Sequence, residues 1–159
     1  MKMKRDGFSL IELIIAIAIL AIFVGVISLS IGLLRSADTK GLASGINGSL
    51  TDLKAKTESH QGPYYLHIYK ATDGYYAHFG DTASFEIPSD VGSDERLGAS
   101  NLIVKTDSVE IDGTNSVVVK IQKKDGAYSM APQYFEVYNG DSKDYTVVLA
   151  RDTGLHYIV

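Results

Sequence analysis

His and acidic side chains are the residues from which this chain could most readily build a metal site. His67 and His78 are expected on one face of a hairpin, diagonal to each other, which hints at a metal site. No third ligand stands at a spacing typical of zinc sites, so packing against aromatic rings or solvent is favoured. Asn139, Asp141 and Asp144 leave open a calcium loop or a polar turn. Their spacing does not match an EF-hand, which favours the turn. We expect no bound metal and no cofactor.

Catalytic motifs are absent from the sequence. It contains no Gly-x-Ser-x-Gly, no His-Glu-x-x-His, no Walker A lysine after the glycines of residues 41–48, and no cysteine. Without cysteine, neither disulfides nor thiolate metal sites can form. We therefore expect a protein that is not an enzyme.

Glu12 is the chemically unusual residue, because it interrupts a long apolar segment. The 27 residues of segment 8–34 contain no other charged side chain, and Lys2, Lys4 and Arg5 precede them. The apolar run is too long for a secretory signal peptide. It suits a transmembrane helix with a cytoplasmic N-terminus, but a carboxylate within a bilayer costs several kcal/mol and calls for a functional reason.

The segment Gly7-Phe8-Ser9-Leu10-Ile11-Glu12-Leu13 resembles the signal of the type IV pilin and type II secretion pseudopilin superfamily. The resemblance implies that a prepilin peptidase removes leader 1–7 by cutting between Gly7 and Phe8, and that Phe8 is then N-methylated. It implies that segment 8–34 first anchors the chain in the cytoplasmic membrane and later forms the core of a surface pilus or pseudopilus. It also implies other pilin or pseudopilin subunits as partners, with Glu12 meeting the Phe8 amine of a neighbour during assembly.

The N-terminal helix is expected to continue to about residue 60. Leu42, Ile46, Leu50 and Leu53 are spaced by four, four and three residues, as on one side of a helix. A second stripe, made of Gly41, Gly45 and Gly48, weakens the helix, which suggests a close approach by another backbone. A loosened connector is the alternative.

Residues 61–159 are expected to form a β-rich head, so the predicted fold is α+β and pilin-like. A hairpin turning at Asp73-Gly74 joins 64–70 to 75–80, a second pairs 101–111 with 116–122, and a third pairs 133–138 with 145–150. A last strand covers 155–159, and 81–100 is expected to be a surface loop with a short edge segment. The closing segment 149–155 resembles the final hairpin of H-type minor pseudopilins and minor pilins.

The first hairpin offers a candidate interface. Alternation places five aromatic or histidine side chains on one face: Tyr65, His67, Tyr69, Tyr76 and His78. Tyr is enriched at interfaces, but packing of these rings on the helix or on a neighbouring loop is the alternative.

Charge limits the possible partners. The chain has a net charge of −4, and because residues 1–7 carry a net +2, the remaining chain carries −6. We expect no direct binding of nucleic acid, which requires clustered Lys and Arg. The expected function is a structural, minor subunit of a type IV pilus or of a pseudopilus. A competence pseudopilin for DNA uptake and a monomeric membrane-anchored binding module are the alternatives.

Overall fold

One long helix precedes all the strands. The computed structural model describes the backbone of residues 10–159 and the side chains of residues 10–25 and 36–159. Helix α1 covers Leu10–Ser59, with Glu12 in its first turn and Lys56 in its last, each favourable to the helix dipole. Pro63 cannot continue the helix, and the first strand begins two residues later.

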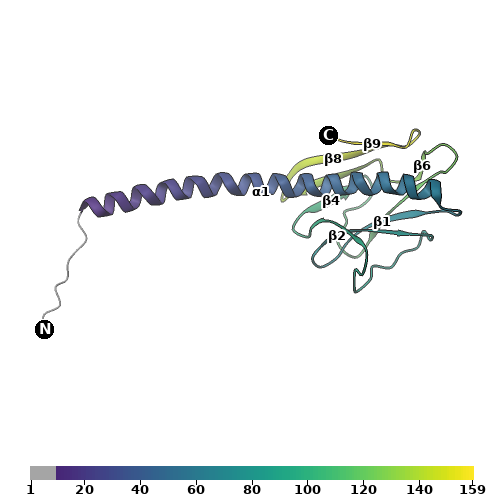
Figure 1. Ribbon diagram of the computed structural model, residues 1–159, viewed down its shortest axis with the longest axis horizontal. Helices are drawn as coiled ribbons and strands as arrows, with labels where there is room; N and C mark the ends of the chain where they lie inside the picture. The colour runs from purple at the N-terminus through teal and green to yellow at the C-terminus, as the bar shows by residue number, and fades with distance from the viewer. Residues whose placement is uncertain (1–9) are drawn as a thin grey trace. The chain divides into compact units, whose positions relative to one another are not determined.

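Two antiparallel sheets follow α1. The order in the five-stranded sheet is β3-β2-β1-β5-β6, and in the four-stranded sheet β4-β7-β8-β9. In Figure 1, β8 and β9 lie on one side of the last part of α1, and β1 and β2 on the other. The strands are β1 Tyr65–Lys70, β2 Gly74–Gly80, β3 Glu95–Ala99, β4 Ile103–Thr106, β5 Ser116–Ile121, β6 Tyr128–Met130, β7 Tyr134–Asn139, β8 Ser142–Ala150 and β9 Leu155–Ile158. The predicted α+β class, a long N-terminal helix with an antiparallel β head, is confirmed.

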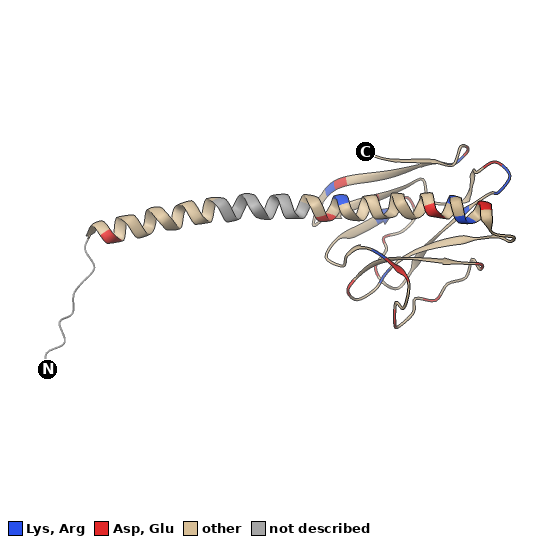
Figure 2. Ribbon diagram, in the orientation of Figure 1, with Lys and Arg blue, Asp and Glu red and all other residues tan. Residues whose placement is uncertain are grey.

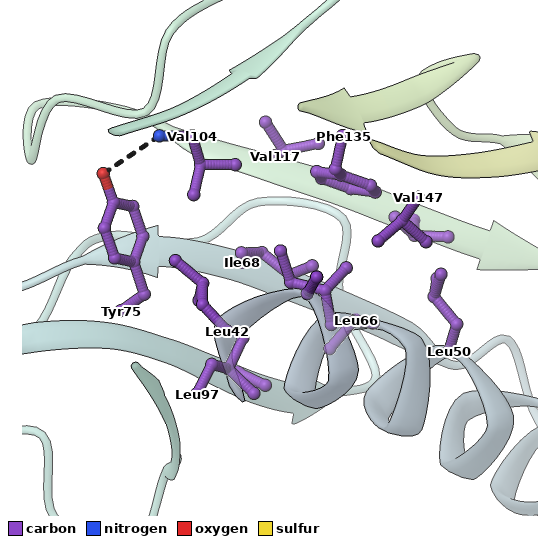
Figure 3. Packing of buried hydrophobic residues seen from close by; sticks show 14 of the residues in the cluster. Leu42, Leu50, Leu66, Ile68, Tyr75, Leu97, Val104, Val117, Phe135 and Val147 are labelled. Carbon is purple, nitrogen blue, oxygen red and sulfur yellow. Dashed lines mark hydrogen bonds between the residues drawn. The ribbon is translucent and has the colours of Figure 1, made fainter. Parts of the chain in front are cut away.

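The core of the head forms around the predicted stripe of α1. Leu42, Ile46, Leu50 and Leu53 are fully buried, and they join side chains of both sheets in one cluster. Figure 3 shows Leu42 and Leu50 among residues of β1, β4, β5, β7 and β8. The chain accordingly divides at residue 35, and the compact unit Ser36–Val159 includes the second part of α1. The predicted head began at residue 61, but the stripe supplies one wall of its core.

The glycines of α1 differ in their surroundings. A Cβ on Gly45 would lie 3.1 Å from the carbonyl oxygen and 3.3 Å from the Cα of Leu97 in β3, so the two backbones approach closely there. A Cβ on Gly41 or Gly48 would meet no atom within 4 Å. The predicted close approach therefore holds for Gly45, while its two neighbours in the stripe face open space.

The first hairpin has the predicted faces but a different turn. Lys70 is the last β1 residue to pair, opposite Tyr75, and the Ala71 N–H donates to the Gly74 carbonyl at 2.8 Å. The prediction of a two-residue Asp73-Gly74 turn was wrong, because Gly74 lacks the positive φ that such a turn requires. The register differs by two residues, which leaves every side chain on its predicted face. His67 lies directly opposite His78, not diagonal to it.

The predicted pairing of 101–111 with 116–122 was also wrong. β4 pairs with β7, and β5 pairs with β1 and β6, so the two segments belong to different sheets. The chain turns back earlier than predicted, because the Thr106 hydroxyl accepts hydrogen bonds from the N–H groups of Ser108 and Val109. Such local side-chain bonds compete with a continuing strand.

The third predicted hairpin and the last strand are present. β7 and β8 turn at Gly140 and Asp141, since Asn139 pairs with Ser142. β9 continues the sheet beside β8 and is linked to the rest of the head by His156. The Nε2 of His156 lies 3.0 Å from the Thr51 hydroxyl of α1, and its Nδ1 lies 2.9 Å from the Tyr128 hydroxyl of β6. Burial lowers the pKa of His156, so this bridge is stable in its neutral form.

Gly154 and Gly140 predict different responses to the same substitution. Both have positive φ, but a Cβ on Gly154 would overlap the carbonyl group of Gly126, whereas one on Gly140 would meet no atom within 4 Å. Gly140→Ala should lower the free energy of unfolding by about 1–2 kcal/mol, the cost of a left-handed alanine. Gly154→Ala should cost roughly a further 1–3 kcal/mol for overpacking. Urea unfolding of the full chain in detergent measures both, and equal losses would contradict the close backbone contact.

Candidate functional site

The first part of α1 exposes apolar side chains on all its sides. Along Leu10–Gly25 every large hydrophobic side chain keeps between 48% (Ile19) and 78% (Leu10) of its surface exposed. These side chains stand at Leu10, Ile11, Leu13, Ile14, Ile15, Ile17, Ile19, Leu20, Ile22, Phe23 and Val24. A helix that is apolar all round is normally buried. Within its own unit, nothing among the described residues covers these side chains.

Glu12 is the one charged residue of Leu10–Gly25 and lies exposed in the first turn of α1. Figure 2 shows an acidic position near the start of the helix, followed by a stretch without charge colours. The partial positive charge of a helix N-terminus favours a carboxylate at this position. The predicted cleavage site, Gly7 and Phe8, lies outside the described residues.

The predicted transmembrane segment is only partly described. Among the described residues, no helical stretch combines the length and the hydropathy that a membrane crossing requires. Of the predicted segment 8–34, residues 8 and 9 and the side chains of 26–34 lie outside the described part.

The five residues of the candidate interface meet across β1 and β2. The ring centroids of His67 and His78 are 6.1 Å apart, and those of Tyr69 and Tyr76 are 5.9 Å apart. Tyr65 stands at the end of the same face, 6.4 Å from His67. Alternation along two paired strands is sufficient to produce this arrangement.

A segment of the connection between β2 and β3, residues 81–94, covers this face; we name it the strap. The Phe85 ring lies 4.8 Å from the rings of both His67 and His78, and 5.1 Å from that of Tyr69. At the end of the strap, Asp94 accepts a hydrogen bond from the Tyr69 hydroxyl at 2.7 Å and contacts His78 Nδ1 at 2.8 Å.

Three of the five predicted interface residues are buried: His67, Tyr69 and Tyr76 keep 1%, 0% and 4% of their surfaces exposed. Tyr65 and His78 are half-buried, so for these an interface stays a prediction. The alternative, packing on a neighbouring loop, describes His67 and Tyr69, whose rings lie against Phe85. Tyr76 instead packs against Tyr69, and its hydroxyl donates a hydrogen bond to Asp73.

Burial also shifts the titration of this cluster. It raises the pKa of the Tyr69 hydroxyl well above its ordinary value, an effect that the Asp94 carboxylate increases. Burial lowers the pKa of His67 because the charged imidazolium loses its hydration. The hydrogen bond to Thr82 raises the pKa and offsets only part of this loss. Both side chains are therefore neutral at pH 7.

Metal ligands do not gather in the described part of the chain, where no group of three or more His, Cys, Asp or Glu is placed to hold an ion. At the candidate calcium loop, Asn139 ends β7, Asp141 lies in the turn, and Asp144 Oδ1 accepts a hydrogen bond from Ser142 at 3.2 Å. These residues form the polar turn between β7 and β8.

Sequence patterns did not reveal the strap. Phe85 is a single aromatic residue in a polar loop, and Asp94 is one of several acidic residues there. The sequence did offer one signal for a buried contact: Phe85 is the single large aromatic residue in the connection between β2 and β3. Its contacts are long-range, so no local periodicity reports them.

Asp94 and Asp90 allow a matched test of the strap. Asp94→Asn removes the carboxylate that serves both Tyr69 and His78, and its side chain is only 12% exposed. We expect a loss of about 1–3 kcal/mol in the free energy of unfolding, typical of a disrupted buried hydrogen-bonding group. Asp90→Asn should change it little, since exposed Asp90 accepts only the Gly92 N–H at 3.1 Å. Urea unfolding compares the variants, and equal effects would show that Asp94 does not hold the strap.

Comparison with known proteins identifies the N-terminal segment. Residues 2–28 match the family model of the prokaryotic N-terminal methylation motif. No curated protein and no solved structure matches the chain. The match contains Gly7, Phe8 and Glu12 as well as the exposed apolar part of α1 from Leu10 to Gly25. The chain thus carries the prepilin-type signal of type IV pilins and pseudopilins.

Proposed function

We propose that the chain is a structural, minor subunit of a type IV pilus or of a type II secretion-like pseudopilus. Prepilin peptidase removes residues 1–7, and the subunit assembles with others through the apolar part of α1. The observation that carries the proposal is an all-round apolar helix, Leu10–Gly25, within a matched N-terminal methylation motif. A folded head at the other end of α1 supplies the exposed surface of the filament.

The exposed apolar side chains must be covered in the cell. Burying one large aliphatic side chain is worth about 1.5–3 kcal/mol, so the stretch Leu10–Val24 is worth on the order of 20 kcal/mol in total. A bilayer and a bundle of neighbouring apolar helices provide this cover equally well. The proposal uses both: the helix, residues 8–34, is stored in the cytoplasmic membrane with its N-terminus cytoplasmic and then exchanges lipid for other subunits.

Glu12 accounts for the selectivity of that exchange. Cleavage after Gly7 creates a positively charged amine on Phe8, and a carboxylate in the first turn of a neighbouring helix is a suitable partner. Two unit charges about 4 Å apart attract by roughly 4 kcal/mol at an effective dielectric constant of 20. Desolvation cancels much of this, so the pair specifies register more than it adds stability.

Two alternative functions are distinguished by separate observations. A competence pseudopilin that binds DNA directly would need a basic surface, whereas the chain after residue 7 carries a net charge of −6. A monomeric membrane-anchored binding module would keep its N-terminal residues and would not need Glu12. Processing and assembly are therefore tested separately below.

Gly7→Val tests processing. A peptidase that accommodates a residue without a Cβ before the scissile bond should not cut this variant, so the chain should keep residues 1–7 in the membrane fraction. Gly25→Val, the same substitution at a glycine where an added Cβ would meet no atom within 4 Å, should be cut normally. Mass spectrometry of the N-terminal peptide shows for each variant whether residues 1–7 have been removed. Normal cleavage of Gly7→Val would place the processing site elsewhere.

Glu12→Leu tests assembly. Membrane insertion and cleavage should persist, because an apolar residue replaces a carboxylate five residues beyond the scissile bond. Incorporation next to other subunits should fall about a hundred- to a thousandfold, since removing one partner of a buried pair costs about 3–5 kcal/mol. Asp52→Leu removes an exposed carboxylate from the same helix and should assemble normally. Crosslinking to co-expressed filament subunits measures incorporation, and an undiminished yield from Glu12→Leu would refute the pairing.

A further inference from the structure

The strap is fastened at three points, two of them on the aromatic face of β1 and β2. At its start, Asp81 lies 3.2 Å from Nε2 of His60. In its middle, the Thr82 carbonyl lies 2.9 Å from Nε2 of His67, and Phe85 stacks on the same ring. At its end, Asp94 contacts His78 and Tyr69. Each fastening point thus includes a histidine, the side chain that titrates between pH 5 and 8.

One ring nitrogen of His67, Nδ1, has surroundings that suit only the neutral side chain. A carbonyl oxygen accepts and cannot donate, so the contact with Thr82 requires the proton to lie on Nε2. The Nδ1 of His67 is buried and has no hydrogen-bond partner among the described residues. Protonation would place a new N–H on this atom, together with a positive charge, at a position where neither is solvated. A buried unpaired donor and an unpaired charge are both costly.

Apart from the Thr82 carbonyl, no group facing His67 compensates this charge. The elements packed against it are β2, β5 and the strap, which bring His78, Lys120 and Asp94 to this region, while β1 adds Tyr65 and Tyr69. His78 and Lys120 repel a cation, and the tyrosines are neutral. Asp94 is the one carboxylate of the set, and it is already engaged by His78 and Tyr69.

The other two histidines that contact the strap differ from His67 in their surroundings. His60 and His78 each lie against a strap carboxylate and are 39% and 37% exposed, so a charge on either ring would be paired and hydrated. His67 is 1% exposed. Because an unpaired charge costs far more when buried than near the surface, protonation of His67 should dominate the response of the strap to acid.

We propose that residues 81–94 form an acid-released strap, in which protonation of buried His67 at Nδ1 destabilises the closed arrangement, so that the strap opens and uncovers part of the aromatic face of β1 and β2. The side chains uncovered are His67 and Tyr69, on which Phe85 packs in the closed strap. The direction of the pH dependence follows from proton binding. His67 binds a proton more tightly when the strap is open than when it is closed, so the closed state loses stability as the pH falls below about 6.5.

Hydrogen–deuterium exchange of the full chain in detergent tests this proposal between pH 7.5 and 5.5, a window in which ordinary carboxyl groups do not titrate. After correction for intrinsic exchange rates, peptides from 81–94 should open about three- to tenfold more at pH 5.5. Peptides from β4 and β7, which contain no histidine, serve as the internal reference and should not change.

Two substitutions of His67 should each remove this response. His67→Phe keeps the stack on Phe85 but cannot be protonated, so peptides from 81–94 should open to the same extent at pH 7.5 and pH 5.5. His67→Gln, which can still donate to Thr82, replaces His67→Phe if that variant does not fold, with the same expected loss of release. The same acid response in wild type and in the folded His67 variant, or none in wild type, would overturn the proposal.

Discussion

The head depends on one contact, the burial of a single side of α1 against two sheets. Leu42, Ile46, Leu50 and Leu53 are fully buried, and they connect sheets that share no strand. Without this stripe, each sheet would expose its inner face, because no other described helix is present to cover it. The compact unit that begins at Ser36 is therefore a helix-and-sheet unit, and a boundary at the end of α1 would divide its core.

The same helix has the opposite character over Leu10–Gly25, where its apolar side chains remain exposed on all sides. The amphipathic part packs on the two sheets, whereas nothing among the described residues of its own unit covers the apolar part. The match to the N-terminal methylation motif at residues 2–28 includes this apolar part, so the prepilin-type signal and the exposed apolar side chains belong to one segment.

Local patterns predicted the parts of the fold that depend on local physics. The spacing of the leucines identified the buried side of α1, and two-residue alternation identified both faces of the first hairpin even though its turn was misplaced. Patterns failed where the outcome depends on distant partners. Nothing in 101–111 indicates that β4 pairs with β7, and nothing near Phe85 indicates that it stacks on two histidines. The N-terminal signal was recognisable because its chemistry is confined to consecutive residues.

Intact-mass and N-terminal peptide mass spectrometry of the protein purified from its native membrane most directly tests whether the chain is a processed filament subunit. We predict a chain that begins at Phe8, lacks residues 1–7 and carries one added methyl group on its amine. We also predict that Glu12 and the complete apolar helix are retained. A chain that still begins at Met1, or one cut within or after the apolar segment, would contradict this function.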